Sequence, residues 1–293
     1  MRKFLLIVAG IFITVCFSLY ILDMGWYEMI YFLGYPGGNQ HHPEVEIDES
    51  VADKPVITGE LDPLARAVNE PLTIIEGDWK LIWSDEFDEL YLDLERWTKV
   101  DRKDNYNNEL QYYTPPNSYL QDGCLYLTAK NENKEGKPYT SAMVQTMNKL
   151  SFCYGKIEAR IKLPVGKGLF PAFWLLSYTG ESEIDIMEMI GSEPDIIYGV
   201  NHYLSENKLT RTYSLIEIDS PEQFHVYTLE WEEHELRWYV DGTMFHQSYR
   251  VPSEEMYIIF TLAVGGDWPG YPDHQTVFPC DFVVDYVKLY RHN

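Results

Sequence analysis

The sequence predicts an all-β domain built as a sandwich or barrel of antiparallel strands. From Trp79 onward the chain is a series of short runs rich in Val, Ile, Tyr, Phe and Trp, separated by turn residues, and these residue types favour strands. No long segment repeats its apolar residues with the 3.6-residue period of a helix. Asp241-Gly242 directly follows the alternating run 236–240 and is typical of a hairpin turn.

The expected strands follow one another at close intervals through the domain. They are the runs 80–87, 124–130, 143–147, 153–163, 172–176, 184–190, 196–203, 226–231, 236–240, 257–264 and 282–290. A domain of about 215 residues is a normal size for a single sandwich. Two sheets of this kind pack face to face around the core, which leaves one outer, concave face free to hold a polymer.

The first part of the chain, 1–33, predicts a membrane segment. Arg2 and Lys3 precede the uncharged run 4–22, which is close to the ~20 apolar residues that a spanning helix needs. Basic residues before the run and Asp23 after it favour an N-terminus inside and the rest of the chain outside. We expect an uncleaved signal anchor; a cleaved signal peptide and a lipoprotein are the alternatives. All three predict export of the remainder.

The following segment, 34–75, predicts a linker to the domain at 76–293. It contains Gly, Pro and acidic residues and few aromatic ones, a composition typical of a flexible tether.

Composition argues against a nucleic-acid-binding protein and against a disordered one. Basic residues number 23 and acidic residues 46, so the net charge is −23, whereas a nucleic-acid partner requires clustered Lys and Arg. Hydrophobic residues make up 45% of the chain, enough to bury a core.

The exported cysteines, Cys124, Cys153 and Cys280, show no CxxC spacing. We expect buried thiols, and one disulfide with one thiol is the alternative. We expect a monomer.

The most informative segment is the predicted strand around Glu183, Asp185 and Glu188. Side chains alternate along a strand, so Glu183 and Asp185 share one face while the isoleucines beside them enter the core. Glu188 lies an odd number of positions from Glu183, so regular alternation would turn its carboxyl inward. A β-bulge near Met187 adds one residue and returns Glu188 to the face of the other two carboxylates.

Carboxylates gathered in this way point to retaining glycoside hydrolysis, which requires two carboxyls about 5–5.5 Å apart. On this geometry Glu183 is the nucleophile, and Glu188 is the acid/base whose pKa its neighbours raise. Asp185 lies between them and shares a proton with Glu183. A solvated acidic face is the alternative in a chain of this charge, but such a face needs neither an apolar opposite face nor a bulge.

The ExDxxE pattern of this strand resembles the signature of glycoside hydrolase family 16, in its laminarinase-like branch. Further blocks stand in the family's order: IWSDEF (82–87), NNELQYYT (107–114), YGKIEAR (154–160), PAFW (171–174), WYVDG (238–242), AVGGDWPG (263–270) and VDYV (284–287). The resemblance implies a β-jelly-roll of two antiparallel sheets with a concave substrate cleft. It implies hydrolysis, without a cofactor, of internal β-1,3 or mixed β-1,3/1,4 bonds in a β-glucan such as laminarin. It gives Glu183, Asp185 and Glu188 the same roles as the geometry.

Sugar-binding residues are predicted from the same resemblance and from the preference of pyranose rings for flat aromatic side chains. Trp174 and Asn107 match cleft residues of the family, and Trp268 stands in a Gly- and Pro-rich loop. His202, on the next predicted strand, is expected to hydrogen-bond near Glu188. Phe170 stands where the family commonly has a tryptophan. Core packing is the alternative for Trp174, and a structural role is the alternative for His202.

The sequence departs from the family pattern at Met143 as well as at Phe170. Met143 stands where the family commonly has an arginine that contacts sugar. Met143 and Phe170 leave open the same chemistry on a galactan of the agar or carrageenan type, and transglycosylation. A non-catalytic β-glucan-binding sensor on the same fold is a further alternative, although such proteins lose the glutamates.

Many members of the family also hold a structural calcium ion away from the cleft. By resemblance Glu86, Asp285 and the backbone of Gly123 are the candidate ligands.

Overall fold

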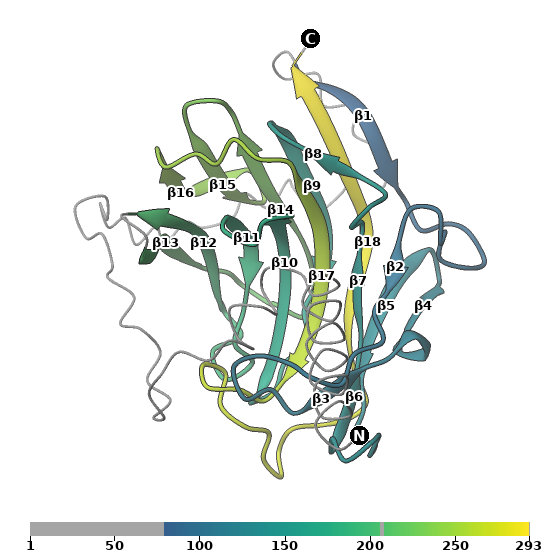
Figure 1. The fold of residues 1–293 in the computed structure, drawn as a ribbon. Coiled ribbons are helices and arrows are strands. Elements are labelled where there is room, and N and C mark those ends of the chain that lie inside the picture. The colour runs from purple at the N-terminus through teal and green to yellow at the C-terminus, as the bar shows by residue number, and fades with distance from the viewer. Residues whose placement is uncertain (1–78, 206–207, 293) are drawn as a thin grey trace, which may run out of the picture. The chain divides into compact units, whose positions relative to one another are not determined.

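The computed structural model describes residues 79–205 and 208–292. The predicted signal anchor at 1–33 and the linker at 34–75 lie outside the described residues, so both stay predictions. Within the described ranges, no helix has the length and apolar character needed to cross a membrane. The family-like blocks all fall inside these ranges, and Figure 1 shows that they form a layered β structure.

Nearly all regular structure in the described residues is β. In chain order the strands are β1 (Trp79–Asp85), β2 (Thr98–Lys99), β3 (Gln111–Tyr113), β4 (Ser118–Gln121), β5 (Cys124–Ala129), β6 (Tyr139–Ser141), β7 (Met143–Gln145), β8 (Ser151–Phe152), β9 (Gly155–Lys162), β10 (Leu169–Ser177), β11 (Glu183–Glu188), β12 (Ile196–Ser205), β13 (Lys208–Glu217), β14 (Phe224–Trp231), β15 (Leu236–Val240), β16 (Thr243–Ser248), β17 (Met256–Val264) and β18 (Cys280–His292). A single short 3₁₀ turn, η3 (Pro115–Asn117), interrupts them among the described residues.

Two eight-stranded antiparallel sheets make the sandwich, which confirms the predicted β-jelly-roll class. The first sheet runs β13-β12-β11-β10-β17-β7-β2, with β8 also paired to β17; we call it the carboxylate sheet. The second runs β16-β15-β14-β9-β18-β5-β4, with β1 paired to β18. Figure 1 shows β1 and β18, the first and last strands of the domain, side by side. Strands β3 and β6 form a small parallel pair.

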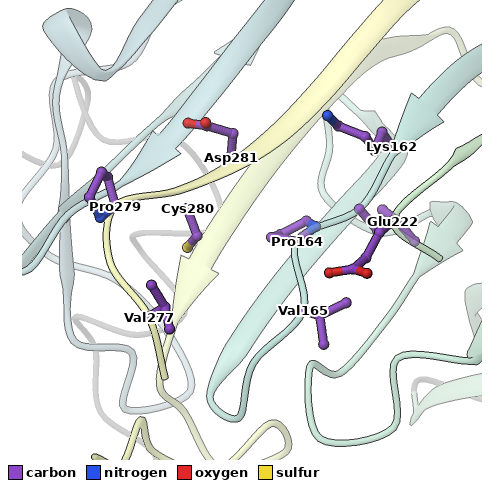
Figure 2. Close-up of a pocket in the computed structure, with 9 residues that line it drawn as sticks. Lys162, Pro164, Val165, Glu222, Val277, Pro279, Cys280 and Asp281 are labelled. Carbon is purple, nitrogen blue, oxygen red and sulfur yellow. The ribbon is translucent and has the colours of Figure 1, made fainter. Parts of the chain in front are cut away.

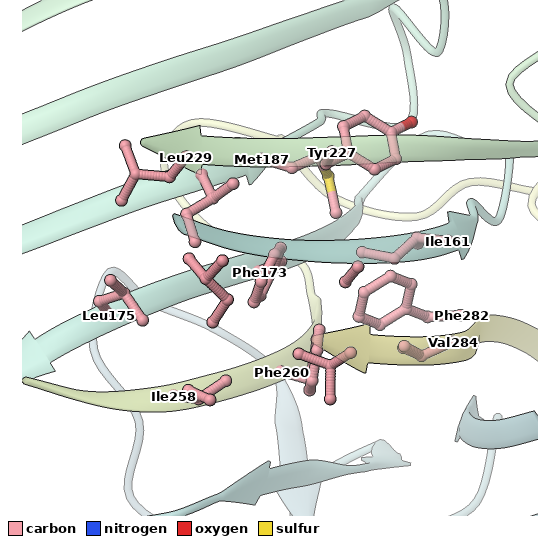
Figure 3. Packing of buried hydrophobic residues seen from close by; sticks show 14 of the residues in the cluster. Ile161, Phe173, Leu175, Met187, Tyr227, Leu229, Ile258, Phe260, Phe282 and Val284 are labelled. Atoms are coloured by element: carbon pink, nitrogen blue, oxygen red, sulfur yellow. The ribbon is translucent and has the colours of Figure 1, made fainter. Parts of the chain in front are cut away.

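The core lies between the two sheets. Phe173 of β10 stacks on Phe260 of β17 with ring centroids 4.7 Å apart. Figure 3 shows these rings facing side chains of the second sheet, among them Ile161, Tyr227 and Phe282. Alternation along each strand delivers one face to this core and leaves the other face of the carboxylate sheet free of it.

The predicted hairpin turn is confirmed. Asp241 and Gly242 have φ of 48° and 78°, the left-handed values that a two-residue hairpin loop of this kind requires. The turn joins β15 to β16 with Val240 opposite Thr243. The described cysteines are free thiols, and burial raises the pKa of Cys280 to about 12.

Candidate active site

The predicted bulge in β11 is confirmed. Across β10, Trp174 pairs with Asp185 and Phe173 with Met187, so β11 contains one residue more than its partner between these pairs. Across β12, the register shifts between Asp185 and Glu188 in the same way. Ile184, Ile186 and Met187 are therefore buried in the core. Two successive residues turn inward at the bulge, which returns Glu188 to the outer face.

Pairing across the carboxylate sheet fixes the neighbours of each carboxylate. Residues directly opposite one another in antiparallel strands project to the same face. Leu176, Glu183 and His202 form one row across β10, β11 and β12; Trp174, Asp185 and Val200 form the next; Ala172, Glu188 and Tyr198 form the third. We call the outer surface that carries these rows the carboxylate face.

A hydrogen bond from the second sheet fixes the backbone of β11. Trp238 of β15 donates its Nε1–H to the carbonyl oxygen of Asp185 at 2.9 Å, and the Trp238 side chain is fully buried. Burial leaves this indole few alternative positions, because protein interiors are packed as densely as crystals. The carboxylates are thereby held on a rigid strand rather than on a loop.

His202 contacts two of the three carboxylates. Its Nε2 lies 3.4 Å from Oδ2 of Asp185 and 3.8 Å from Oε1 of Glu183. The imidazole therefore stands beside the predicted nucleophile and assistant, and its charge also acts on Glu188. Asp185 is 3% exposed, so its carboxyl meets this imidazole in a buried setting.

The carboxyl groups of the site all have raised pKa values. Burial, together with the charge of Asp185, raises the pKa of Glu183 to about 7, although His202 opposes the shift. Burial raises the pKa of Asp185, and the Arg211 guanidinium opposes that shift. Burial and then the charges of Asp185 and Glu183 raise the pKa of Glu188 well above its ordinary value. At neutral pH the site therefore retains protons, as a pair of one acid and one base requires.

These pKa shifts predict a bell-shaped pH dependence of kcat/KM. Activity should rise as pH increases through about 7, where Glu183 becomes ionised, and fall at higher pH where Glu188 loses its proton. Removal of the Arg211 charge in Arg211→Gln should move the alkaline limb to higher pH, because that charge lowers the pKa values of Asp185 and Glu188. Initial rates across a pH series measure both limbs. An Arg211→Gln profile identical to that of the wild type would contradict this electrostatic assignment.

Aromatic side chains lie on both sides of the carboxylates. Trp268 is 45% exposed and makes edge-to-face contacts with Phe170 at 5.3 Å and with Tyr198 at 5.0 Å. Trp174 lies directly beside Asp185 and packs against a second cluster that includes Tyr257. The structure thus brings Trp174, Trp268 and Phe170 to the carboxylate face.

Asn107 belongs to a loop at the end of the same face. It is exposed, and its carbonyl oxygen accepts a hydrogen bond from the Asp267 backbone N–H at 2.9 Å. Asn108 adds a hydrogen bond from its Nδ2 to Oδ1 of Asp267 at 2.8 Å. The two loops that the sequence singles out, around Asn107 and around Trp268, are therefore joined to each other.

Several side chains on this face carry no signal in the sequence. Tyr198, Tyr257 and Arg211 reach it through strand pairing: Arg211 stands opposite His202 across β12 and β13, and Tyr257 stands opposite Leu176 across β10 and β17. Met143 also faces this side, opposite Thr261, and is buried. The position at which the family commonly has an arginine is thus apolar here.

The candidate calcium ligands Asp285 and Glu86 each contact a basic side chain, and the calcium site stays a prediction. Asp285 accepts a hydrogen bond from Arg160 at 2.6 Å, and Glu86 faces Lys288 at 3.3 Å. Each carboxylate already has a basic partner, which is a poor setting for a calcium ligand. In the described part of the chain, Glu183, Asp185 and His202 could themselves hold a metal ion, since their ligand atoms lie within 4.8 Å of one another. An ion there would occupy the carboxylates that the chemistry uses.

A cavity of about 270 Å³ lies elsewhere, at the ends of β9 and β18 in the second sheet. Figure 2 shows Lys162, Glu222 and Asp281 around it. No aromatic side chain lines this cavity, so it offers no flat surface for a sugar ring.

The family model, the related sequences and the solved structures that match this chain all point to the same family. The model of the glycosyl hydrolases family 16 matches residues 82–286. A beta-glucanase of Rhodothermus marinus is 38% identical over 247 residues, which are 73% of this chain and 85% of that protein. The X-ray structure of an endo-beta-1,3-glucanase from Pyrococcus furiosus has 38% sequence identity and a TM-score of 0.69, over 75% of this chain and 98% of that one.

The laminarinase catalytic domain of Thermotoga maritima agrees equally well, with 36% identity and a TM-score of 0.68 over 74% of this chain and 99% of that one. The matched range contains β11, its bulge and the three carboxylates. On these grounds the chain belongs to glycosyl hydrolases family 16.

Proposed function

We propose that this domain hydrolyses internal β-1,3 or mixed β-1,3/1,4 bonds of a β-glucan such as laminarin, with retention of configuration. The observation that carries the proposal is the bulge in β11, which gathers Glu183, Asp185 and Glu188 on one face of a rigid strand. The likeness to beta-glucanases and endo-beta-1,3-glucanases supports the choice of substrate.

In the first step the ionised carboxylate of Glu183 attacks the anomeric carbon, and the glycosidic bond breaks. Glu188 gives its proton to the departing oxygen, so the leaving sugar departs as a neutral alcohol. A covalent glycosyl–enzyme ester and an ionised Glu188 remain. The raised pKa of Glu188 keeps its proton available at neutral pH, which a general acid requires.

In the second step the ionised Glu188 takes a proton from water, and the water oxygen attacks the same anomeric carbon. The ester bond to Glu183 breaks, and both carboxyls return to their starting states. Ligand atoms of Asp185 and His202 lie within 4.8 Å of the Glu183 carboxyl, and Asp185 shares a proton with Glu183 as Glu183 gains and loses its charge. A sugar hydroxyl in place of water would give transglycosylation by the same step.

We also propose that the protein is exported and tethered to a membrane by residues 1–33. This rests on the uncharged run 4–22 with basic residues before it.

The test of the proposed function is reducing-end release from a panel of polymers by the full chain. Laminarin and mixed-linkage glucan should be cleaved internally, with a rapid fall in polymer length, while agarose and carrageenan should not. NMR of the first products should show the β-anomer. Cleavage of a galactan alone would replace the substrate but keep the mechanism. Binding of glucan without any turnover would favour the sensor alternative and contradict the proposal.

A further inference from the structure

Among residues 79–205 and 208–292, two partly buried arginines lack a carboxylate partner, although acidic side chains are abundant in the molecule. The chain has 46 acidic and 23 basic residues, so an unpaired, partly buried arginine is unexpected. Arg160 and Arg237 are partly buried and paired with carboxylates. Arg102 and Arg211 are also partly buried, but neither has an acidic side chain within ion-pair distance among residues 79–205 and 208–292.

The guanidinium of Arg102 is held in place without use of its N–H groups. Its Cζ lies 5.5 Å from the ring centroid of Tyr106 and 5.5 Å from that of Tyr113. A pair of backbone hydrogen bonds, each 2.9 Å long, joins Arg102 to Tyr113. Its Nε is buried and has no acceptor. Cation–π contacts of this kind fix the plane of the guanidinium without using the donors of its two terminal nitrogens.

Glu109, an acidic residue close to Arg102, does not form an ion pair with its guanidinium. The charge of Arg102 lowers the pKa of Glu109, which burial raises, so the two groups are close. The Glu109 carboxylate, however, accepts its hydrogen bond from Nε2 of Gln111 at 2.6 Å. Gln111 is itself fixed, because its Oε1 accepts from the Val264 backbone N–H at 2.8 Å. The Arg102 guanidinium therefore has no competing partner in this network.

Pairing across the sheet gives the position of Arg102 relative to the carboxylates. Tyr113 belongs to the buried cluster that also contains Met143 and Tyr257, and the Arg102 charge acts on Tyr257. Tyr257 stands opposite Leu176, which stands opposite Glu183. Two strand spacings, about 10 Å, thus separate the backbone of Glu183 from that of Tyr257. Arg102 therefore lies near β17 on the carboxylate face, about two strands from β11.

We propose that Arg102 binds a sugar unit of the glucan chain at this remote position and makes the enzyme prefer long chains. Guanidinium N–H groups are donors only, and the hydroxyl and ring oxygens of a neutral sugar supply acceptors. The partly exposed ring of Tyr106 lies beside the guanidinium and adds aromatic surface. Contacts with a part of the substrate that does not react increase kcat/KM only for substrates long enough to reach them. This inference rests on the proposed function and specifies its substrate length.

The test compares Arg102→Gln with the wild type on a ladder of β-1,3-glucan oligosaccharides. Loss of a hydrogen bond to a charged donor should lower kcat/KM about tenfold or more on long oligomers, chiefly through KM. The shortest oligomer that the wild type cleaves should be cleaved at an unchanged rate. Arg102→Lys should recover part of the loss, because it restores the charge without the planar fork.

Two further measurements separate binding from structure. Arg250→Gln is the matched control, since Arg250 is exposed and stands 6.0 Å from the ring of Tyr203 without an ion pair; it should behave as the wild type at every length. In the inactive Glu183→Gln background, Arg102→Gln should weaken calorimetric binding of a long oligomer and leave the melting temperature unchanged.

An equal loss at every length, or no loss at any length, would overturn the role of Arg102 while leaving the proposed function intact. A wild type that neither cleaves nor binds any glucan would overturn both.

Discussion

Glu183→Ala should lower kcat on laminarin by about four orders of magnitude or more, as expected when a nucleophile is removed, and leave the fold unchanged. The Glu183 side chain is partly exposed, its carboxyl lies beside Asp185 and His202, and its pKa is raised. Its ionised form is costly to the fold, so truncation should not destabilise the domain at neutral pH. The measurement is reducing-end release together with the melting temperature of each protein.

Azide distinguishes loss of the nucleophile from general damage to the site. The side chain removed from Glu183→Ala leaves space beside the anomeric carbon, and azide placed there can attack it on an activated substrate. The product should be an α-glycosyl azide, because one displacement inverts the centre. The matched control is Glu181→Ala, which removes an exposed carboxylate just before β11 and should retain wild-type turnover. Full activity of Glu183→Ala would refute the mechanism.

Glu188→Gln should lower kcat on polymers by about 10²–10⁴-fold, the usual contribution of general acid–base catalysis. The loss should depend on the leaving group: an aryl glycoside that departs without a proton should form the covalent intermediate nearly as fast as with the wild type. The substitution keeps the volume of the side chain, so the bulge and its buried neighbours should be preserved. Burst kinetics on an aryl glycoside measure the two steps separately.

The stereochemistry of rescue distinguishes Glu188 from Glu183. Azide added to Glu188→Gln should accelerate breakdown of the accumulated intermediate and give a β-glycosyl azide, since two inversions restore the configuration. An α product from Glu188→Gln would mean that the roles of the two glutamates are exchanged. Equal losses on polymers and on aryl glycosides would exclude Glu188 as the acid.

Alternation and turn chemistry are local signals, and the features that depend on them are predicted correctly from the sequence. The hairpin at Asp241-Gly242 follows from backbone preference alone. The bulge in β11 follows from the odd spacing of Glu183 and Glu188 together with the need to bury the apolar residues between them. The hairpin turn and the bulge each involve only a few consecutive residues, so they can be predicted without knowing which strands pair.

Short strands and polar strands were not predicted from the sequence, because neither kind shows a clear alternation of apolar residues. The strands β2, β3, β6 and β8 have three residues or fewer, too few to show a period. The ten-residue β13 lies at an edge of the carboxylate sheet, where solvent permits polar residues on its outer face. In such a strand the apolar periodicity is weak, and pairing with β12 decides the structure.

The chemical surroundings of the carboxylates depend on strand order, which alternation does not reveal. Tyr257 is distant from Glu183 in the chain and approaches it because β10 pairs with both β17 and β11. Arg102 follows because it pairs with Tyr113, which packs in the same cluster as Tyr257. His202 was predicted near Glu188, and the register places it opposite Glu183, a neighbour that alternation along one strand does not reveal. The predicted calcium ligands Asp285 and Glu86 contact the basic side chains of Arg160 and Lys288, which the resemblance did not indicate.

The carboxylates gathered on β11 also make the folding stability of the enzyme depend on pH. A carboxyl whose pKa is higher in the folded than in the unfolded chain favours folding at low pH, and that contribution is lost as pH rises through the folded value. For Glu183 the loss runs from the ordinary value of 4.5 to about 7, the interval in which the nucleophile becomes active. The domain is therefore more robust in its resting, protonated state than in its working one, and a bound glucan chain that favours the folded form would protect it during turnover.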